Sequence, residues 1–267
     1  MILTRNHLVI GCLVACCFCI AGCKNESRVP QGTSEEKVAE QASNASRVLV
    51  FSRTKGYFHE SIPSGISAIQ KLGTENGFHV DTTKDAAKFT EENLKRYKAI
   101  IFLSTTQDVL NDEQQKAMET YIRGGGGFVG IHAAADTEYD WPWYNKLVGA
   151  YFKSHPNNPN VRKAVVNVID KNHPSTKDVP DNWERSDEWY NYRDINPDLK
   201  VLAKLDESSY EGGENGDNHP IVWYHEYDGG RAFYTGGGHT KESFEDPLFM
   251  KHVLGGIHYA MGGEQPN

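Results

Sequence analysis

Short apolar runs alternate along the first half of the chain with longer segments in which apolar residues recur every three or four positions. The short runs are typical of strands buried on both faces, and the longer segments are typical of amphipathic helices. The pattern predicts strands at 47–51, 78–82, 99–103 and 128–131, with helices at 62–72, 90–96 and 111–123 between them. This alternation predicts an α/β fold with an open, largely parallel sheet covered on both faces.

The second half of the chain follows a looser pattern. It predicts strands at 161–169, 199–205, 220–227 and 231–235 and a closing helix at 247–261. Asp228, Gly229 and Gly230 are typical turn residues between the last two strands, which are therefore expected to form an added β-hairpin. Because no repeat or domain break interrupts residues 47–262, we treat them as one flavodoxin-like, doubly wound domain.

The segment from Gly124 to Asp136 presents a polar residue at the end of a central strand. Four glycines precede the apolar run Phe128–Ile131, and His132 follows directly, with three alanines after it. Small residues permit a sharp turn, so the histidine is presented as a side chain is in a nucleophile elbow. Open α/β sheets bind ligands at this edge, and His132 is therefore the first candidate for a functional residue.

The charge balance excludes one class of function. The chain has a formal net charge of −8 and no long run of lysine or arginine. Such a chain offers little to neutralise phosphates, so we do not expect it to bind nucleic acid.

The amino-terminal residues differ from the rest of the chain. A charged start precedes an apolar run that is too short for a comfortable membrane span and ends at Ile20–Cys23. This is the arrangement of an export signal, and its last four residues resemble a bacterial lipobox. We expect a signal peptide at 1–22, a lipid on Cys23 and a polar tether at 23–46, which would hold the protein in the bacterial cell envelope. An uncleaved anchor helix is the alternative.

Several motifs together resemble the ThuA-like (trehalose utilisation) family over residues 47–261, nearly the whole predicted domain. They are the glycine-rich segment 124–137, Trp141-Pro142, Phe152–Pro156, Asp187–Tyr190, His219–Trp223 and Gly230–His239. The resemblance implies the fold of class I glutamine amidotransferases, which agrees with the open sheet predicted from the alternating pattern. It also implies a role in bacterial sugar utilisation, with oxidised (keto) disaccharides as the substrate class.

The chain departs from the glutamine amidotransferases at the residue on which their chemistry depends. Those enzymes need a cysteine at the elbow, paired with a histidine, to form an acyl intermediate. Here the elbow carries His132, and His239, after the last strand, takes the place of the amidotransferase histidine. All five cysteines lie at or before Cys23, so hydrolysis of glutamine through a thioester is excluded.

His132 and His239 are the predicted catalytic residues. Imidazole titrates near neutral pH and acts as a general acid or base, and it is also a common metal ligand. Glu188 and His155 are expected nearby, so a divalent metal site of His132, His155 and His239 is an alternative to acid–base use, and structural hydrogen bonding is a third. Asp136 either fixes the tautomer of His132 as a carboxylate partner or caps the helix that follows.

The remaining candidates are substrate-binding residues. Three of them follow the first strand and are therefore expected at the same sheet edge as His132. Aromatic rings offer flat apolar faces to a sugar, although most aromatic residues of a domain belong to its core. The binding candidates are Arg53, Tyr57, His59, Trp141, His155, Trp189 and Tyr190.

These observations predict an exported, lipid-anchored enzyme that acts on a keto-disaccharide or glycoside as an isomerase, lyase or hydrolase. For a keto sugar the first step is abstraction of a proton beside the carbonyl, which needs a base and a group that stabilises the enediolate. The alternative is a non-catalytic sugar-binding lipoprotein of the same utilisation system, because one fold hosts many functions. A structural role in an envelope complex is the third interpretation.

Overall fold

The computed structural model describes residues 45–263. The predicted signal peptide, the predicted lipidation site Cys23 and most of the predicted tether lie outside these residues. Within them, no helix combines the length and the apolar character that crossing a bilayer requires.

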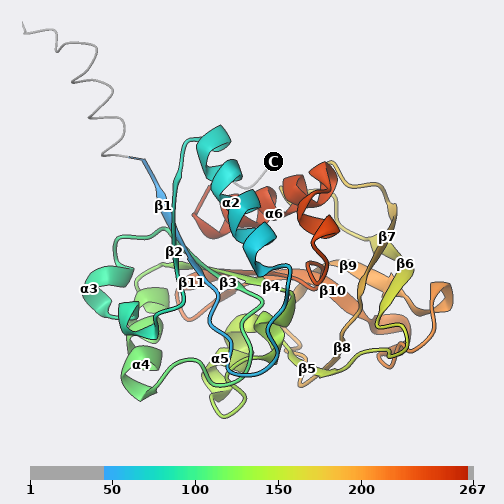
Figure 1. The fold of residues 1–267 in the computed structure, drawn as a ribbon, viewed down its shortest axis with the longest axis horizontal. Helices are drawn as coiled ribbons and strands as arrows, with labels where there is room; N and C mark the ends of the chain where they lie inside the picture. Colours follow the sequence, from blue (N-terminus) through green and yellow to red (C-terminus); the bar gives the residue numbers. More distant parts are fainter. Residues whose placement is uncertain (1–44, 264–267) are drawn as a thin grey trace, which may run out of the picture. The chain divides into compact units, whose positions relative to one another are not determined.

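One half of the main sheet is parallel, as the alternating pattern predicts (Figure 1). Its strands are β1 (Arg47–Phe51), β2 (His79–Thr83), β3 (Ala99–Leu103), β4 (Gly127–Ile131) and β11 (Gly230–Thr235). They lie in the order β2-β1-β3-β4-β11, and every neighbouring pair is parallel. All residues of β3 and β4 are buried, as expected for strands covered on both faces.

Helices cover both faces of this parallel half (Figure 1). On one face lie α2 (Ile62–Asn76) and α6 (Pro247–Ala260), which contact each other and the sheet. On the other face lie α4 (Asp112–Arg123) and α5 (Pro142–Val148), with the short helix α3 (Glu91–Leu94) packed against α4. This is the doubly wound arrangement that the sequence predicts.

Local sequence signals explain where α3 and α4 begin. The hydroxyl of Thr90 accepts a hydrogen bond from the backbone N–H of Asn93, so Thr90 caps α3. The side chain of Asn111 accepts one from the N–H of Gln114, and the side chain of Gln114 accepts one from the N–H of Asn111. This reciprocal pair satisfies donors that the start of a helix would otherwise leave free.

The other half of the sheet is antiparallel and larger than the predicted hairpin. It consists of β10 (Pro220–Tyr227), β9 (Lys200–Asp206), β6 (Val161–Val168) and β7 (Asn182–Glu188), in that order from β11 to the edge. The hairpin of β10 and β11 is confirmed, and the positive φ angles of its turn residues suit a two-residue turn. The α/β fold class is confirmed, and the sequence pattern does not predict β7.

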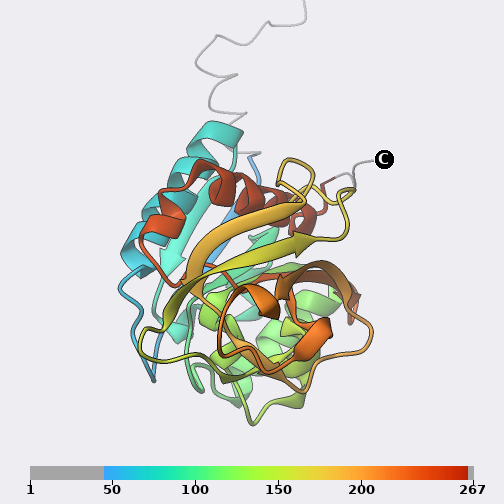
Figure 2. The same cartoon turned by 90° about the vertical axis from the view of Figure 1, so that its right-hand side faces the viewer.

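The antiparallel half curls back toward the carboxyl ends of the parallel strands (Figure 2). Three strands separate β11 from β7 in the sheet order, yet Asp187 of β7 accepts hydrogen bonds from the backbone of Gly238 and His239, which follow β11. A small sheet of β5 (Tyr151–Ser154) and β8 (Asn191–Arg193) completes the fold. The end of β7 therefore meets the sheet edge at which α/β folds bind ligands.

Candidate active site

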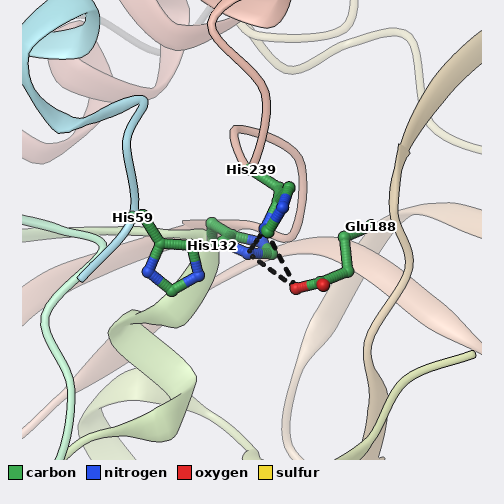
Figure 3. Close-up of side chains that lie close together, drawn as sticks. All are labelled: His59, His132, Glu188 and His239. Carbon is green, nitrogen blue, oxygen red and sulfur yellow. Dashed lines mark hydrogen bonds and ion pairs between the residues drawn. The ribbon is translucent and has the colours of Figure 1, made fainter. Parts of the chain in front are cut away.

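Three histidines and one glutamate converge at this sheet edge (Figure 3). His59 lies in the loop after β1, His132 follows β4, His239 lies in the loop after β11, and Glu188 is the last residue of β7. Each residue offers a ring nitrogen or a carboxylate oxygen, and these atoms all lie within 4.8 Å of one another. We call these four residues the His3Glu cluster. The structure thus brings His132 and His239 together and adds His59 and Glu188 to them.

The backbone of His132 adopts a left-handed conformation, with a φ of 51°. The residue opens a 3₁₀ helix, His132–Asp136, in which Ala133, Ala134 and Ala135 are fully buried. These small residues allow the sharp turn after β4 that the sequence predicts. A left-handed conformation in a residue other than glycine costs about 1–3 kcal/mol and clusters at functional sites.

A backbone carbonyl fixes the ring orientation of His132. Its Nδ1 lies 3.0 Å from the carbonyl oxygen of Gly236, which can only accept a hydrogen bond, so Nδ1 carries the hydrogen. In the neutral ring Nε2 then presents its lone pair to the cluster, 3.4 Å from Glu188 Oε2 and 3.2 Å from His239 Nδ1. Because the side chain of His132 is 0% exposed, residues that are less buried must make the direct contacts with a substrate.

Glu188 and His239 form the charged pair of the cluster. His239 Nδ1 lies 3.0 Å from Glu188 Oε2, and the side-chain amide of Asn160 donates to Glu188 Oε1 at 2.6 Å. Burial alone would raise the pKa of Glu188, but the hydrogen bonds and charges of His132 and His239 outweigh it and hold this pKa well below its ordinary value. Burial lowers the pKa of His239, whereas the hydrogen bond and charge of Glu188 raise it, and the net result is a raised pKa.

His59 is buried against the other two histidines. Its ring meets those of His132 and His239 edge-on, with centroids 4.8 and 5.2 Å away. Burial, and then the like charges of these two rings, lowers the pKa of His59 to about 2, so the ring is neutral at physiological pH. Its Nδ1 is buried and has no hydrogen-bond partner within residues 45–263. A buried polar atom without a partner is costly, so His59 Nδ1 calls for a partner that these residues do not supply.

The cluster has the chemistry for two kinds of function. An imidazole paired with a carboxylate is suited to proton transfer, and the carboxylate orients the ring and stabilises its charged form. Histidine nitrogens and a glutamate oxygen that point at one another also suit a divalent transition metal. The cluster therefore contains both the predicted acid–base residues and a set of ligands that could hold an ion.

Asp187, next to Glu188, holds the backbone around the cluster. Its side chain is fully buried and accepts hydrogen bonds from the backbone N–H groups of Glu188, Gly238 and His239. The guanidinium of Arg185 also donates to it, at 2.9 Å. One carboxylate therefore fixes both the strand end that carries Glu188 and the loop that carries His239.

His155 and Tyr190, two of the predicted binding residues, lie beside the cluster. His155 Nε2 is 3.6 Å from Glu188 Oε1, and the His155 side chain is 26% exposed. The ring of Tyr190 packs on His132 with a centroid distance of 4.3 Å and is stacked with His155. His155 thus stands on the solvent side of Glu188.

Tyr57 and Arg53 share the loop that carries His59. Tyr57 is exposed, and its ring packs edge-on against His59 at 4.9 Å, which places it at the rim of the cluster. Arg53 is half-buried, and within residues 45–263 no hydrogen bond or ion pair joins it to the cluster. The structure therefore places the Tyr57 ring against the site, whereas Arg53 is joined to it by no hydrogen bond or ion pair within the described residues.

Asp136 has neither of its two predicted roles. The carbonyl of Gly236, not Asp136, holds the ring of His132. The carboxylate of Asp136 accepts hydrogen bonds from the hydroxyl of Tyr139 and the amide of Gln107 instead, and α5 begins without a side-chain cap. The sequence could not show this, because a backbone carbonyl leaves no mark in the residue pattern.

Trp141 and Trp189 lie in the core, which corrects the prediction that they bind substrate. Trp141 stacks on Trp143 and donates its indole N–H to Glu119 of α4. Trp189 is 1% exposed and donates its indole N–H to the backbone carbonyl of Arg162. Packing on other side chains covers both rings, so neither offers a free face to a sugar.

Asn160 and Asp187 are site residues that the sequence analysis does not single out. Asp187 belongs to the motif 187–190, which is the only signal that points to it. Asn160 lies in a loop rich in asparagine and proline, a composition that predicts only a turn. Its contact with Glu188 depends on the curl of the antiparallel half, which a sequence pattern does not reveal.

A cavity of about 840 Å³ lies away from the cluster, at the amino ends of the parallel strands. Its lining includes Lys98, Gly125 and Arg231, which lie just before β3, just before β4 and at the start of β11. None of the four cluster residues lines it. We place the candidate site at the cluster because converging titratable groups are stronger evidence of chemistry than the size of a hollow.

Comparisons with known proteins agree with the fold and with the motifs. Among solved structures, a ThuA-like protein from Bacteroides uniformis is 27% identical, with a TM-score of 0.69 over 81% of this chain and 92% of that chain. A ThuA-like protein from Parabacteroides merdae shares the fold, with 20% identity and a TM-score of 0.64 over 84% of this chain and 92% of that chain. A cytoplasmic protein from Salmonella typhimurium also shares it, with 11% identity and a TM-score of 0.56 over 80% of this chain and 99% of that chain. No match was found among curated proteins. The ThuA model, described as trehalose utilisation, matches residues 47–260, and the chain therefore belongs to the ThuA family.

Proposed function

We propose that this protein is an enzyme of carbohydrate utilisation that abstracts a proton beside the carbonyl of an oxidised disaccharide or glycoside. The observation that carries this proposal is the convergence of four titratable side chains within 4.8 Å at the ligand-binding edge of the sheet. Membership of the ThuA family supports a carbohydrate as the substrate class. No cysteine follows Cys23, so glutaminase chemistry has no nucleophile in this domain.

Two imidazoles at the cluster are exposed enough to touch a substrate, His155 (26%) and His239 (15%). His155 Nδ1 lies 2.8 Å from the carbonyl oxygen of Pro156 and donates to it, so Nε2 of the neutral ring has a free lone pair and is the base. The pairing with Glu188 raises the pKa of His239 and so favours its charged form, which would stabilise the oxygen of the enediolate. The enclosed rings of His59 and His132 support these groups from behind.

The proton abstraction needs no reactant other than the base and the oxidised sugar. The base takes the proton from the carbon beside the carbonyl, and the electron pair of the broken C–H bond moves to give the enediolate. In an isomerisation, the former carbonyl carbon takes up the proton, and the hydroxyl proton of the deprotonated carbon passes to the former carbonyl oxygen. In an elimination, the electron pair of the enediolate re-forms the carbonyl, a C=C bond forms on the other side of the deprotonated carbon, and the glycosidic oxygen leaves the β-carbon and takes up the proton.

Deuterium exchange tests this step directly. Purified protein is incubated in D₂O with an oxidised disaccharide and with the parent disaccharide, exchange beside the carbonyl is followed by NMR, and products are followed by chromatography. We expect exchange and product with the oxidised sugar only, and a loss of about a hundredfold or more in His155→Asn and in His239→Asn. His258→Asn, on α6, is the matched control and should keep the wild-type rate. Tight binding of the sugar without exchange or product would instead support the sugar-binding lipoprotein.

We also propose that the chain is exported and anchored to the cell envelope by a lipid on Cys23. The charged start, the short apolar run and the lipobox-like end of the first 23 residues support this location. Radiolabelled palmitate added to bacterial cells should enter the wild-type protein and the Cys19→Ser control but not Cys23→Ser. Equal labelling of all three proteins would contradict the anchor.

A further inference from the structure

We propose that His59, His132, Glu188 and His239 bind one divalent first-row transition-metal ion (Figure 3). The inference rests on the proposed function only for what the ion does in the reaction. It deepens that proposal by adding an ion that would take the place of protonated His239 as the source of positive charge at the site. The existence of the ion site stands on the geometry of the four side chains.

Three of the four atoms already form one face of a coordination shell. His132 Nε2, His239 Nδ1 and Glu188 Oε2 lie 3.0, 3.2 and 3.4 Å apart. Around an ion with bonds of about 2.0–2.2 Å, neighbouring ligand atoms lie about 2.8–3.1 Å apart in octahedral geometry and about 3.3–3.6 Å apart in tetrahedral geometry. The observed triangle therefore has the size that an ion requires.

A neutral His132 leaves the same triangle short of hydrogens. In that form its ring hydrogen is on Nδ1, where the carbonyl of Gly236 accepts it, and Nε2 and the Glu188 carboxylate then face each other as two acceptors. A single hydrogen on His239 Nδ1 would have to serve both. An ion in the middle accepts electron pairs from all three atoms at once, and its binding releases the shared proton to solvent.

His59 supplies the fourth ligand. It is 3% exposed, its Nδ1 has no partner within the described part of the chain, and one of its nitrogens lies within 4.8 Å of the other three ligand atoms. Opposite ligands of a six-coordinate ion lie about 4.2 Å apart, so a small movement of His59 completes the set.

The residues around the four proposed ligands hold them in place and leave His155, a ligand in the predicted metal site, outside the set. The carbonyl of Gly236 orients His132, and Asn160 occupies Glu188 Oε1, which leaves Oε2 for the ion. His155 approaches Oε1, on the outer side of the carboxylate, and is not among the four converging residues. The metal site of His132, His155 and His239 predicted from the sequence is therefore replaced by one that contains His59 and Glu188.

The ligand types indicate the class of ion. Imidazole and carboxylate ligands without a thiolate favour Mn²⁺, Fe²⁺, Co²⁺, Ni²⁺ or Zn²⁺, and two histidines with one carboxylate on a face leave positions open on the other side. When bound, such an ion supplies positive charge that polarises a carbonyl and stabilises an enediolate. His155 remains free of the ion to act as the base.

Metal content measured without any substrate tests the site. Chelator-treated full-length protein is dialysed separately against Mn²⁺, Co²⁺, Ni²⁺ and Zn²⁺, freed of unbound ion, and analysed by plasma mass spectrometry. We expect one ion per chain in the wild type for at least one metal. His59→Asn and Glu188→Gln should raise the Kd by about a hundredfold or more, whereas His155→Asn and His258→Asn should stay within about tenfold.

Each outcome of this experiment supports or contradicts the four-ligand metal site or the proposed enzyme. Stoichiometric binding of none of the four metals, or an unchanged Kd in His59→Asn, would overturn the four-ligand site. If a ligand variant does not fold, the wild type still gives an answer, because the chosen ion should raise its Tm and no rise would count against the site. Binding without turnover would keep the metal site and contradict the proposed enzyme. Undiminished turnover in ion-free protein would keep the enzyme and contradict the role of the ion in its reaction.

Discussion

Replacement of Asp187 by asparagine should lower the free energy of unfolding by about 3–5 kcal/mol. The carboxylate is fully buried and carries the charge that balances Arg185, whose Nη2 lies 2.9 Å from Oδ2. Asparagine keeps the size of the side chain but leaves Arg185 as a buried cation without its counterion. One oxygen also becomes an NH₂ group, which cannot accept the hydrogen bonds that Gly238 or His239 now donates. Urea denaturation of both proteins measures the difference.

Asp194 offers a matched control for this substitution. It pairs with Arg193 at the surface, where the two side chains are 58% and 46% exposed. Asp194→Asn should change the free energy of unfolding by no more than about 1 kcal/mol, because solvent screens the pair. Equal effects of the two substitutions would show that Asp187 does not hold the loop of His239 as the structure indicates.

Replacement of Glu188 by glutamine should lower the pKa of His239 and slow the proposed proton transfer by about a hundred- to ten-thousandfold. Burial lowers the pKa of His239 and Glu188 raises it, so removal of the charge leaves burial as the dominant influence. In the metal-free wild type, the raised pKa stabilises the fold fully below the ordinary value of 6.5, and this stabilisation is lost as pH rises through the raised pKa. Glu188→Gln should not show this loss of stability with rising pH.

NMR titration of chelator-treated protein measures this pKa in both forms. Glu60→Gln is the matched control, because Glu60 makes an exposed ion pair with Lys241 and loses the same charge in the same way. Its substitution should leave the pKa of His239 unchanged. The coupling between Glu188 and His239 would be refuted by identical His239 titrations in Glu188→Gln and the wild type.

The parallel half of the fold could be predicted from the sequence because its strands are short apolar runs between amphipathic helices. The bounds of β1 and β3 agree with the predictions, and α4 covers nearly the same residues as the predicted helix at 111–123. The edge strand β7 could not be predicted in the same way. Its sequence, Asn182–Glu188, is almost entirely polar, and its pairing with β6 decides its conformation.

The candidate site was predictable where it depends on the parallel strands. The carboxyl ends of β1, β4 and β11 share one edge, so His59, His132 and His239 were all expected there. Glu188 depends on the curl of the antiparallel half, which arises from accumulated twist and long-range pairing. The carbonyl of Gly236 orients His132 through the backbone, and such a contact has no residue signature.

The origin of the cluster in two different parts of the sheet affects how homologous sequences should be sorted. The three imidazoles come from loops beside one another, whereas the only anion comes from a strand at the far edge. A homologue could therefore keep every histidine and lose the acid through a change at one distant position. In such a protein burial would be the dominant influence on the histidine at position 239, so its neutral form would be favoured and the charged group that stabilises the enediolate would be missing. The residue that follows the buried aspartate of the edge strand, more than the histidine-bearing turn, should separate catalysts from carriers.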